Sequence, residues 1–147
     1  MGVGGVASKR EQLMDACSHG HLDIVKDLIK NGVPIYEDAI CCASRNNQLD
    51  IIKYLIEQHN VPITKIAIGW ATYNGRIDIL KYLLEIGTPF YIKQVITVSH
   101  IKWAAFLGHM DIVKCLVEYG APIDKEAIDS AEDMLHFDIV DYLFFNA

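Results

Sequence analysis

The residues best suited to chemistry cluster near the start of the chain, where Cys17, His19, His21 and Asp23 follow one another at short intervals. A cysteine thiolate beside a histidine is the pairing used by cysteine nucleophiles. Cys17, however, directly follows Ala16, which belongs to a recurring apolar pattern. We therefore interpret these residues as structural, and we predict no catalytic residue and no enzyme activity.

The cysteines and histidines do not have the spacing of a metal site. There is no CxxC pair, no HExxH sequence, no nucleophile elbow and no glycine-rich phosphate loop. No export signal is recognisable, which favours reduced, packed thiols over disulfides or zinc ligands. We predict no metal, no cofactor and a cytoplasmic location. The four cysteines are Cys17, Cys41, Cys42 and Cys115.

The composition excludes several broad classes of protein. Of 147 residues, 52% are hydrophobic and only 22% are charged, which excludes a disordered chain. The longest uncharged stretch, residues 66–75, is half of the roughly 20 residues that a membrane span requires. The net charge is −6, and from Asp111 onward 9 acidic residues face 2 basic ones. Such acidity disfavours binding to a phosphate backbone, so we predict no nucleic acid partner. From the lack of a spanning stretch we predict no membrane partner.

Internal repetition is the dominant feature of the sequence. An Asp-Ile pair within an apolar segment occurs five times, at spacings of 27, 28, 33 and 27 residues. An alanine lies seven residues before each aspartate, and a leucine lies five residues after it. The aspartates are Asp23, Asp50, Asp78, Asp111 and Asp138, and the alanines are Ala16, Ala43, Ala71, Ala104 and Ala131.

Each copy is predicted to form two short helices. Three residues before each alanine lies Leu or Ile, which places both on one helix face. Four residues after the alanine, the first four copies have a residue suited to a left-handed helix end: Gly20, Asn47, Gly75 and Gly108. Ser8 and Glu11 match a capping box at the first helix. Because so small a pair cannot bury its own apolar stripe, the pairs are expected to stack as a solenoid.

These residues resemble the ankyrin repeat family. The match is strongest over residues 20–32 and 104–120, and the resemblance extends over residues 9–147. It implies an all-α solenoid of stacked antiparallel helix pairs. Residues 1–8 are small and rich in glycine, and we expect them to form a flexible lead. The expected repeats are 9–35, 36–63, 64–90, 91–123 and 124–147. The short repeats look like those of giant-virus and amoebal ankyrin proteins. If the protein is viral, its expected location is the host cytoplasm.

Two departures from the family pattern affect the expected fold. The Thr and His that tie the first helix of an ankyrin repeat to its neighbours are absent from their positions. Three of the four connections are six residues short, so the projecting β-hairpins should be mostly missing. The connection from Phe90 to Ile101 has full length but lacks the Asn-Gly or Asp-Gly of a tight hairpin. We expect there either extra helical turns before Trp103 or an irregular insertion.

The resemblance implies a protein–protein interaction module that binds through the concave face of its first helices. Residues one before, two after and three after each core alanine share that face. Tyr73, Phe106 and Leu107 are expected at the surface, whereas Trp70 and Trp103 could be surface anchors or could fill the core between repeats. The flanks are polar, with Ser130 and Asp133 in the last copy. The predicted partner-binding residues are Arg45, Asn46, Trp70, Tyr73, Asn74, Trp103, Phe106 and Leu107.

Other functions stay open at this point. The chain could be an adaptor that recruits a target to a ubiquitin ligase or another host complex. It could also be an enzyme or ligand-binding protein without a recognisable motif, or a structural spacer. The last helix remains apolar to its end, and we predict weak self-association there through Leu143, Phe144 and Phe145.

Overall fold

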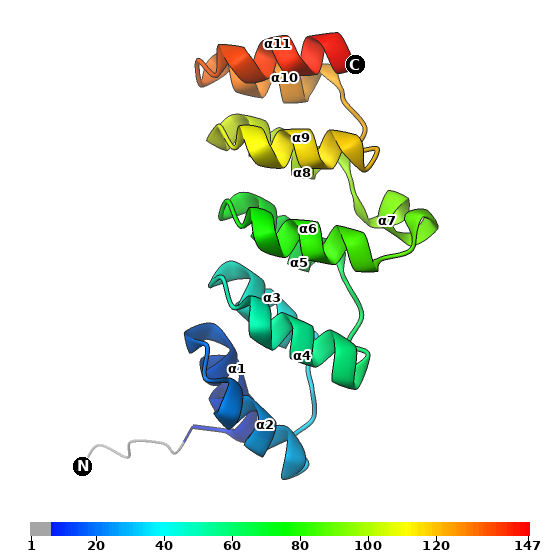
Figure 1. The fold of residues 1–147 in the computed structure, drawn as a ribbon. Helices are drawn as coiled ribbons and strands as arrows, with labels where there is room; N and C mark the ends of the chain where they lie inside the picture. The colour runs from blue at the N-terminus through cyan, green and yellow to red at the C-terminus, as the bar shows by residue number, and fades with distance from the viewer. Residues whose placement is uncertain (1–6) are drawn as a thin grey trace, which may run out of the picture. The chain divides into compact units, whose positions relative to one another are not determined.

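The computed structural model describes residues 7–147, which contain eleven helices and no strand (Figure 1). The expected lead over residues 1–8 lies mostly outside this range, because residues 1–6 are not among those described. The chain forms two compact units, Met1–Pro62 and Ile63–Ala147, which are described separately below.

The first unit contains two helix pairs. The first helix of one pair packs on the first helix of the other, and the second helices do the same. Leu13 and Ile40, which lie three residues before a core alanine, are fully buried between them. The helices are α1 Lys9–His19, α2 Leu22–Lys30, α3 Asp38–Arg45 and α4 Leu49–His59.

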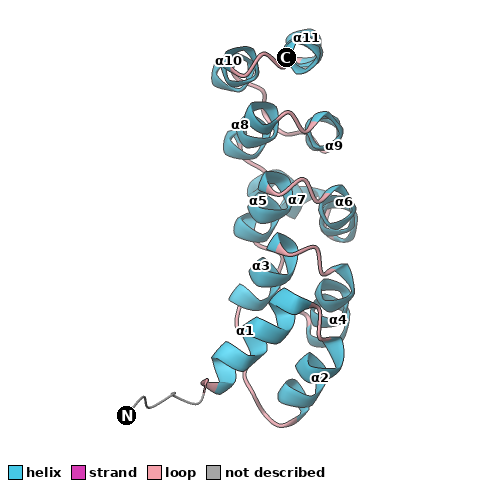
Figure 2. Cartoon of the chain, turned by 90° about the vertical axis from the view of Figure 1, so that its left-hand side faces the viewer, coloured by secondary structure: helices cyan, strands magenta, loops and turns pink. Residues whose placement is uncertain are grey.

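The second unit contains three helix pairs and one additional short helix. Figure 2 shows α5, α8 and α10 as one layer and α6, α9 and α11 as the other. The alanines of the repeat are buried between helices of the first layer, where their small side chains allow close approach. The prediction of an all-α fold of helix pairs is confirmed. The helices are α5 Lys65–Tyr73, α6 Ile77–Ile86, α7 Pro89–Val95, α8 Val98–Leu107, α9 Met110–Glu118, α10 Lys125–Asp133 and α11 Phe137–Asn146.

The helix ends follow the predicted signals. Ser8 Oγ accepts a hydrogen bond from the backbone N–H of Glu11 (3.1 Å), and the Glu11 carboxylate accepts one from the N–H of Ser8 (2.7 Å). Left-handed backbone occurs at all four predicted positions, from φ 63° at Asn47 to φ 78° at Gly20. The fifth copy also turns this way, at Leu135 (φ 61°), where the sequence offers no residue suited to it.

Close packing gives Gly108 a second role besides its backbone conformation. A Cβ atom built on this residue would lie 2.6 Å from Cε1 of His136, which precedes α11, the second helix of the next pair. The glycine therefore makes room for a histidine ring that packs across the boundary between repeats. Gly32 has a similar φ of 82°, but no atom lies within 4 Å of the corresponding position.

The long connection after α6 forms the helix α7, which is one of the two expected alternatives. Thr88 caps it by accepting a hydrogen bond from the N–H of Tyr91 (3.3 Å), and Pro89 occupies the first turn. The Tyr91 hydroxyl donates to the carbonyl of Ile63, and Ile92 is buried. These contacts hold α7 against the rest of the second unit.

His100 ties α8 to α5, although the family's Thr and His are absent from their usual positions. His100 is buried, its Nε2 donates to the carbonyl of Lys65 (2.9 Å), and its Nδ1 accepts from the N–H of Thr97 (3.0 Å). His100 precedes Ile101, whereas the family's histidine follows the corresponding position, which is Lys102 here. The same physical role is therefore performed from a different position.

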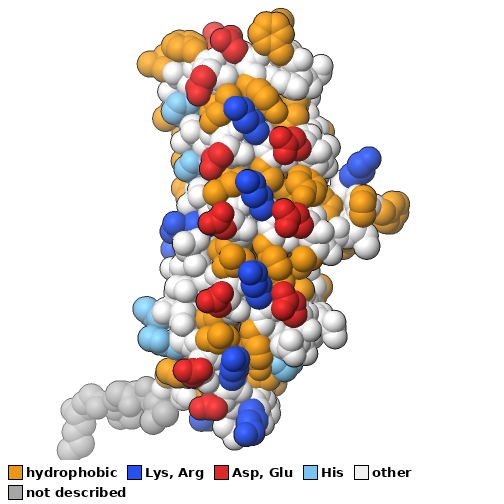
Figure 3. Space-filling model, viewed as in Figure 1, with side chains coloured by type: hydrophobic (Ala, Val, Ile, Leu, Met, Phe, Trp, Pro, Cys, Tyr) orange, Lys and Arg blue, Asp and Glu red, His pale blue; other side chains and the backbone are white. Residues whose placement is uncertain are grey.

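In each unit, the second helices of the pairs present a surface of mixed charge. Figure 3 shows basic side chains along this face, with acidic ones on both sides of them. Lysine side chains also cover aromatic rings of the neighbouring pair, with Lys26 Nζ 5.4 Å from the Tyr54 ring centre and Lys114 Nζ 5.8 Å from that of Tyr142. Such contacts shield apolar surface and contribute modestly to stability.

Candidate functional site

The most distinctive surface of the second unit is a row of four aromatic side chains on α5 and α8. We call Trp70, Tyr73, Trp103 and Phe106 the aromatic row. Exposed fractions are 46% for Tyr73, 48% for Trp103 and 38% for Phe106, while Trp70 is half-buried. The alanines of these helices occupy the core instead, so stacking of the repeats does not require the aromatic rings to be buried.

The rings of the aromatic row contact one another edge to face. The ring centres of Trp70 and Tyr73 are 6.3 Å apart, those of Tyr73 and Trp103 are 5.6 Å apart, and those of Trp103 and Phe106 are 6.1 Å apart. The interplanar angles lie between 72° and 87°. This geometry suits the quadrupoles of the rings and contributes about 0.5–1.5 kcal/mol per pair. The contacts restrict the rotamers of the exposed rings before any partner arrives.

A groove of about 530 Å³ adjoins the aromatic row between α8 and α10. Its polar wall belongs to α10, whose N-terminus is capped by Asp124 accepting from the N–H of Ala127 (2.9 Å). Lys102 forms an ion pair with Glu126 (2.8 Å), and this hydrogen bond raises the pKa of Lys102. The groove is lined by Ser99, Lys102, Trp103, Phe106, Ser130 and Asp133.

The lining includes two residues that the sequence pattern did not select, Ser99 and Lys102. Both precede Ala104 in α8, at offsets outside the three positions chosen for the binding face. Ser130 and Asp133 of α10 occupy chosen positions and do line the groove. A search that included the residue two before each core alanine would have found Lys102.

The other predicted partner-binding residues have different surroundings. Asn74 donates its side-chain amide to the carbonyl of Trp70 (2.9 Å), and Asn46 donates in the same way to Cys42 (2.8 Å). Both amides thus satisfy the last carbonyls of their own helices. Leu107 is half-buried at the end of α8. Arg45 is exposed and, like Asn46, lies in the first unit.

Cys17, the candidate nucleophile of the sequence, lies in the core. Cys17 is fully buried, and burial, followed by the neighbouring Cys42, raises the pKa of its thiol to about 12. The thiol therefore stays protonated at neutral pH, which contradicts the nucleophile interpretation of Cys17. Within residues 7–147, no group of three or more His, Cys, Asp or Glu side chains could hold a metal ion.

The end of the last helix has an exposed aromatic pair. Phe144 and Phe145 are 70% and 83% exposed, and their ring centres are 6.0 Å apart. Leu143, which was predicted to share this surface, is instead fully buried in the core. It occupies the position five residues after Asp138, which is a buried leucine in all five copies.

Models of known protein families match most of the chain. A model described as ankyrin repeats in three copies matches residues 13–94, and a model of the single ankyrin repeat matches residues 97–129. Neither match indicates giant-virus or amoebal proteins. A search of curated proteins gave no match. Among the helices of residues 7–147, none has the length and apolar character required to cross a membrane.

Proposed function

The chain belongs to the ankyrin repeat family, and on that premise we propose that it binds a partner protein through the aromatic row. Ankyrin repeats are typically protein–protein interaction modules and are generally not catalytic. The observation that supports this particular face is the exposure of Tyr73, Trp103 and Phe106 in mutual contact. A fold that needed these rings only for packing would bury them.

The physical properties of the row suit a binding surface. Trp and Tyr are enriched among residues that dominate binding energy, because each buries a large area at low entropic cost. Here the edge-to-face contacts already restrict the rings. A partner would therefore lose little additional side-chain entropy on association. The adjacent groove provides space for a side chain of the partner, and Ser130 and Asp133 offer polar contacts at its edge.

The proposal separates binding from stability in a direct way. We expect the double variant Tyr73→Ala/Phe106→Ala to lose the specific proteins that the wild-type chain captures from a cell extract. Its melting temperature should fall by only about 3–6 °C, since the three ring contacts that it removes are partly exposed and contribute near the low end of their range. Phe137→Ala is the matched control, because Phe137 is exposed but lies on α11. A large loss of melting temperature in the double variant, or unchanged capture, would contradict the proposal.

We also propose weak self-association through Phe144 and Phe145. Six residues after each aspartate the chain has an apolar residue, which is Leu84 in α6 and Phe144 in α11. Leu84 is buried, whereas Phe144 is 70% exposed. An apolar position that is covered in one repeat is thus left open in the last one. Sedimentation equilibrium tests this: we expect the average mass to rise with concentration, and a strictly monomeric species at high concentration excludes it.

A further inference from the structure

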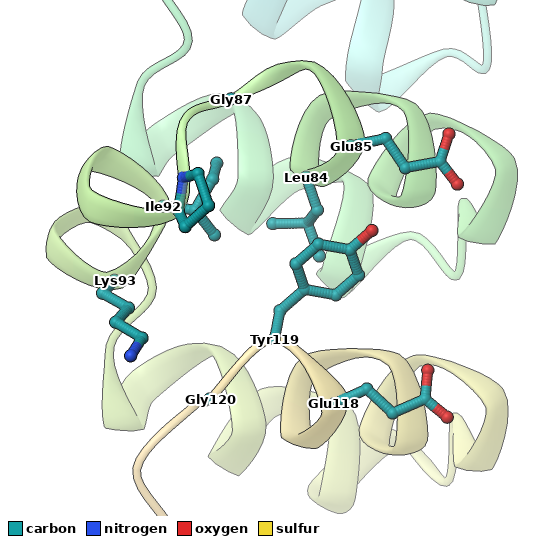
Figure 4. Close-up of a pocket in the computed structure, with 9 residues that line it drawn as sticks. Leu84, Glu85, Gly87, Ile92, Lys93, Glu118, Tyr119 and Gly120 are labelled. Carbon is teal, nitrogen blue, oxygen red and sulfur yellow. The ribbon is translucent and has the colours of Figure 1, made fainter.

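A second groove, of about 490 Å³, lies in the second unit among α6, α7 and α9. Figure 4 shows its residues, none of which lines the groove beside the aromatic row. Its floor is apolar, formed by the buried side chains of Leu84 and Ile92. The half-buried ring of Tyr119 forms one wall. The groove exists because α7 projects beside α6 (Figure 1).

Charge is distributed unequally around this groove. Glu85 and Glu118 both lie on one side of the Tyr119 ring, and Lys93 lies on the opposite side (Figure 4). The two glutamates also stand in the last turns of α6 and α9, where the unpaired helix carbonyls add partial negative charge. One end of the groove therefore favours a cation.

The surrounding groups leave this negative charge largely uncompensated. Lys81 and Lys114 lie one turn before the two glutamates, but the ion pairs found in residues 7–147 do not include either glutamate. Lys114 instead lies over the ring of Tyr142. Burial raises the pKa of Tyr119, and Glu85 and Glu118 add to this effect, which is the response expected of a phenol in a negative field.

We propose that this groove binds an arginine side chain presented by a protein segment. The guanidinium group would lie between Glu85 and Glu118, since its planar fork pairs with carboxylates through two hydrogen bonds. Its face would stack on the ring of Tyr119, and its aliphatic stem would lie along the apolar part of the groove. An apolar floor with carboxylates at one end matches the chemistry of arginine along its whole length. The proposal does not depend on the function of the aromatic row.

The test uses the full chain labelled with ¹⁵N and two short peptides that differ in one charge. One peptide, acetylated and amidated, has a central arginine flanked by alanine and glycine, and the other has citrulline, which has the same shape without the charge. We expect the arginine peptide to shift the backbone amides of Gly87, Tyr119 and Gly120 saturably. The citrulline peptide should bind at least about tenfold more weakly.

Variants locate the binding site. Glu85→Gln/Glu118→Gln should weaken the arginine peptide at least about tenfold. The control is Glu57→Gln, which changes the same repeat position in α4, outside the groove, and should leave the affinity within about twofold. Equal binding of both peptides, shifts confined to the aromatic row, or no saturable shift below about 10 mM peptide would overturn the proposal.

Discussion

Replacing His100 with alanine should destabilise the second unit by about 3–4 kcal/mol. The ring is only 6% exposed, and it joins the start of α8 to the start of α5 through hydrogen bonds of 3.0 Å and 2.9 Å. Each lost hydrogen bond is worth about 1 kcal/mol, and the space left by the ring adds about 1–2 kcal/mol. The melting temperature should fall by about 6–16 °C, at about 2–4 °C per kcal/mol for a chain of this size.

Urea unfolding followed by tryptophan fluorescence measures this loss. Both tryptophans of the chain, Trp70 and Trp103, lie on the helices that His100 connects, so the signal reports on the relevant unit. His21→Ala is the matched control, because His21 is exposed and its side chain makes no capping hydrogen bond. A loss below about 1 kcal/mol for His100→Ala, or an equal loss for the control, would refute the assigned role.

The same residue predicts a pH dependence. Burial, with a smaller effect of Lys65, lowers the pKa of His100 below its usual 6.5. The unfolded state therefore binds more protons as pH falls below about 6.5, and folding loses stability there. His100→Gln lacks this titration but keeps a donor for the carbonyl of Lys65. The stability advantage of wild type over His100→Gln should shrink between pH 7.5 and pH 5. A constant or growing advantage would contradict the neutral, buried histidine.

Three further substitutions or reactions test the helix ends and the core. In urea unfolding, Gly108→Ala should lower the free energy of unfolding by about 2 kcal/mol or more, and Gly32→Ala by only about 1 kcal/mol. Both glycines have a left-handed backbone, but only at Gly108 would the new Cβ clash with a neighbour. Equal losses would exclude the clash. Leu135→Gly should stabilise the folded chain by about 1 kcal/mol, because glycine adopts the left-handed backbone without strain and the leucine side chain is exposed. A loss of stability would show that the leucine side chain contributes packing. Iodoacetamide at pH 8 should label the half-buried Cys41 before Cys17, whose pKa of about 12 keeps its thiol protonated; labelling of Cys17 at the same rate in the folded chain would contradict its burial.

The repeat and its helix pairs could be predicted because each depends on residues at fixed spacing. Gly20 and Gly108 mark helix ends through their own backbone preference, and Ser8 with Glu11 forms a local cap. Such signals act within a few residues and are visible in a single sequence. The left-handed turn at Leu135 was not predictable in this way, since there the packing of the neighbouring helices overrides the preference of leucine.

The other features that the sequence did not predict depend on contacts between residues far apart in the chain. His100 acts through the carbonyl of Lys65, 35 positions away, and the sequence gives no sign of that contact. Extra helical turns after α6 were one of two expectations because the connection lacks the Asn-Gly or Asp-Gly of a tight hairpin. Thr88 and Pro89 are a local start signal for this helix that was not used. The groove beside the aromatic row combines Lys102 of α8 with Asp133 of α10, so only their arrangement in space reveals it.

Photo-crosslinking tests the proposed binding face most directly. Benzoylphenylalanine in place of Phe106 would report proteins that touch the aromatic row, and the same amino acid in place of Phe137 serves as the control on α11. In a cell extract, we predict discrete adducts at position 106 that disappear when Trp103 is also changed to alanine. The same adducts at both positions, or adducts that persist without Trp103, would show that the partner does not bind through the aromatic row.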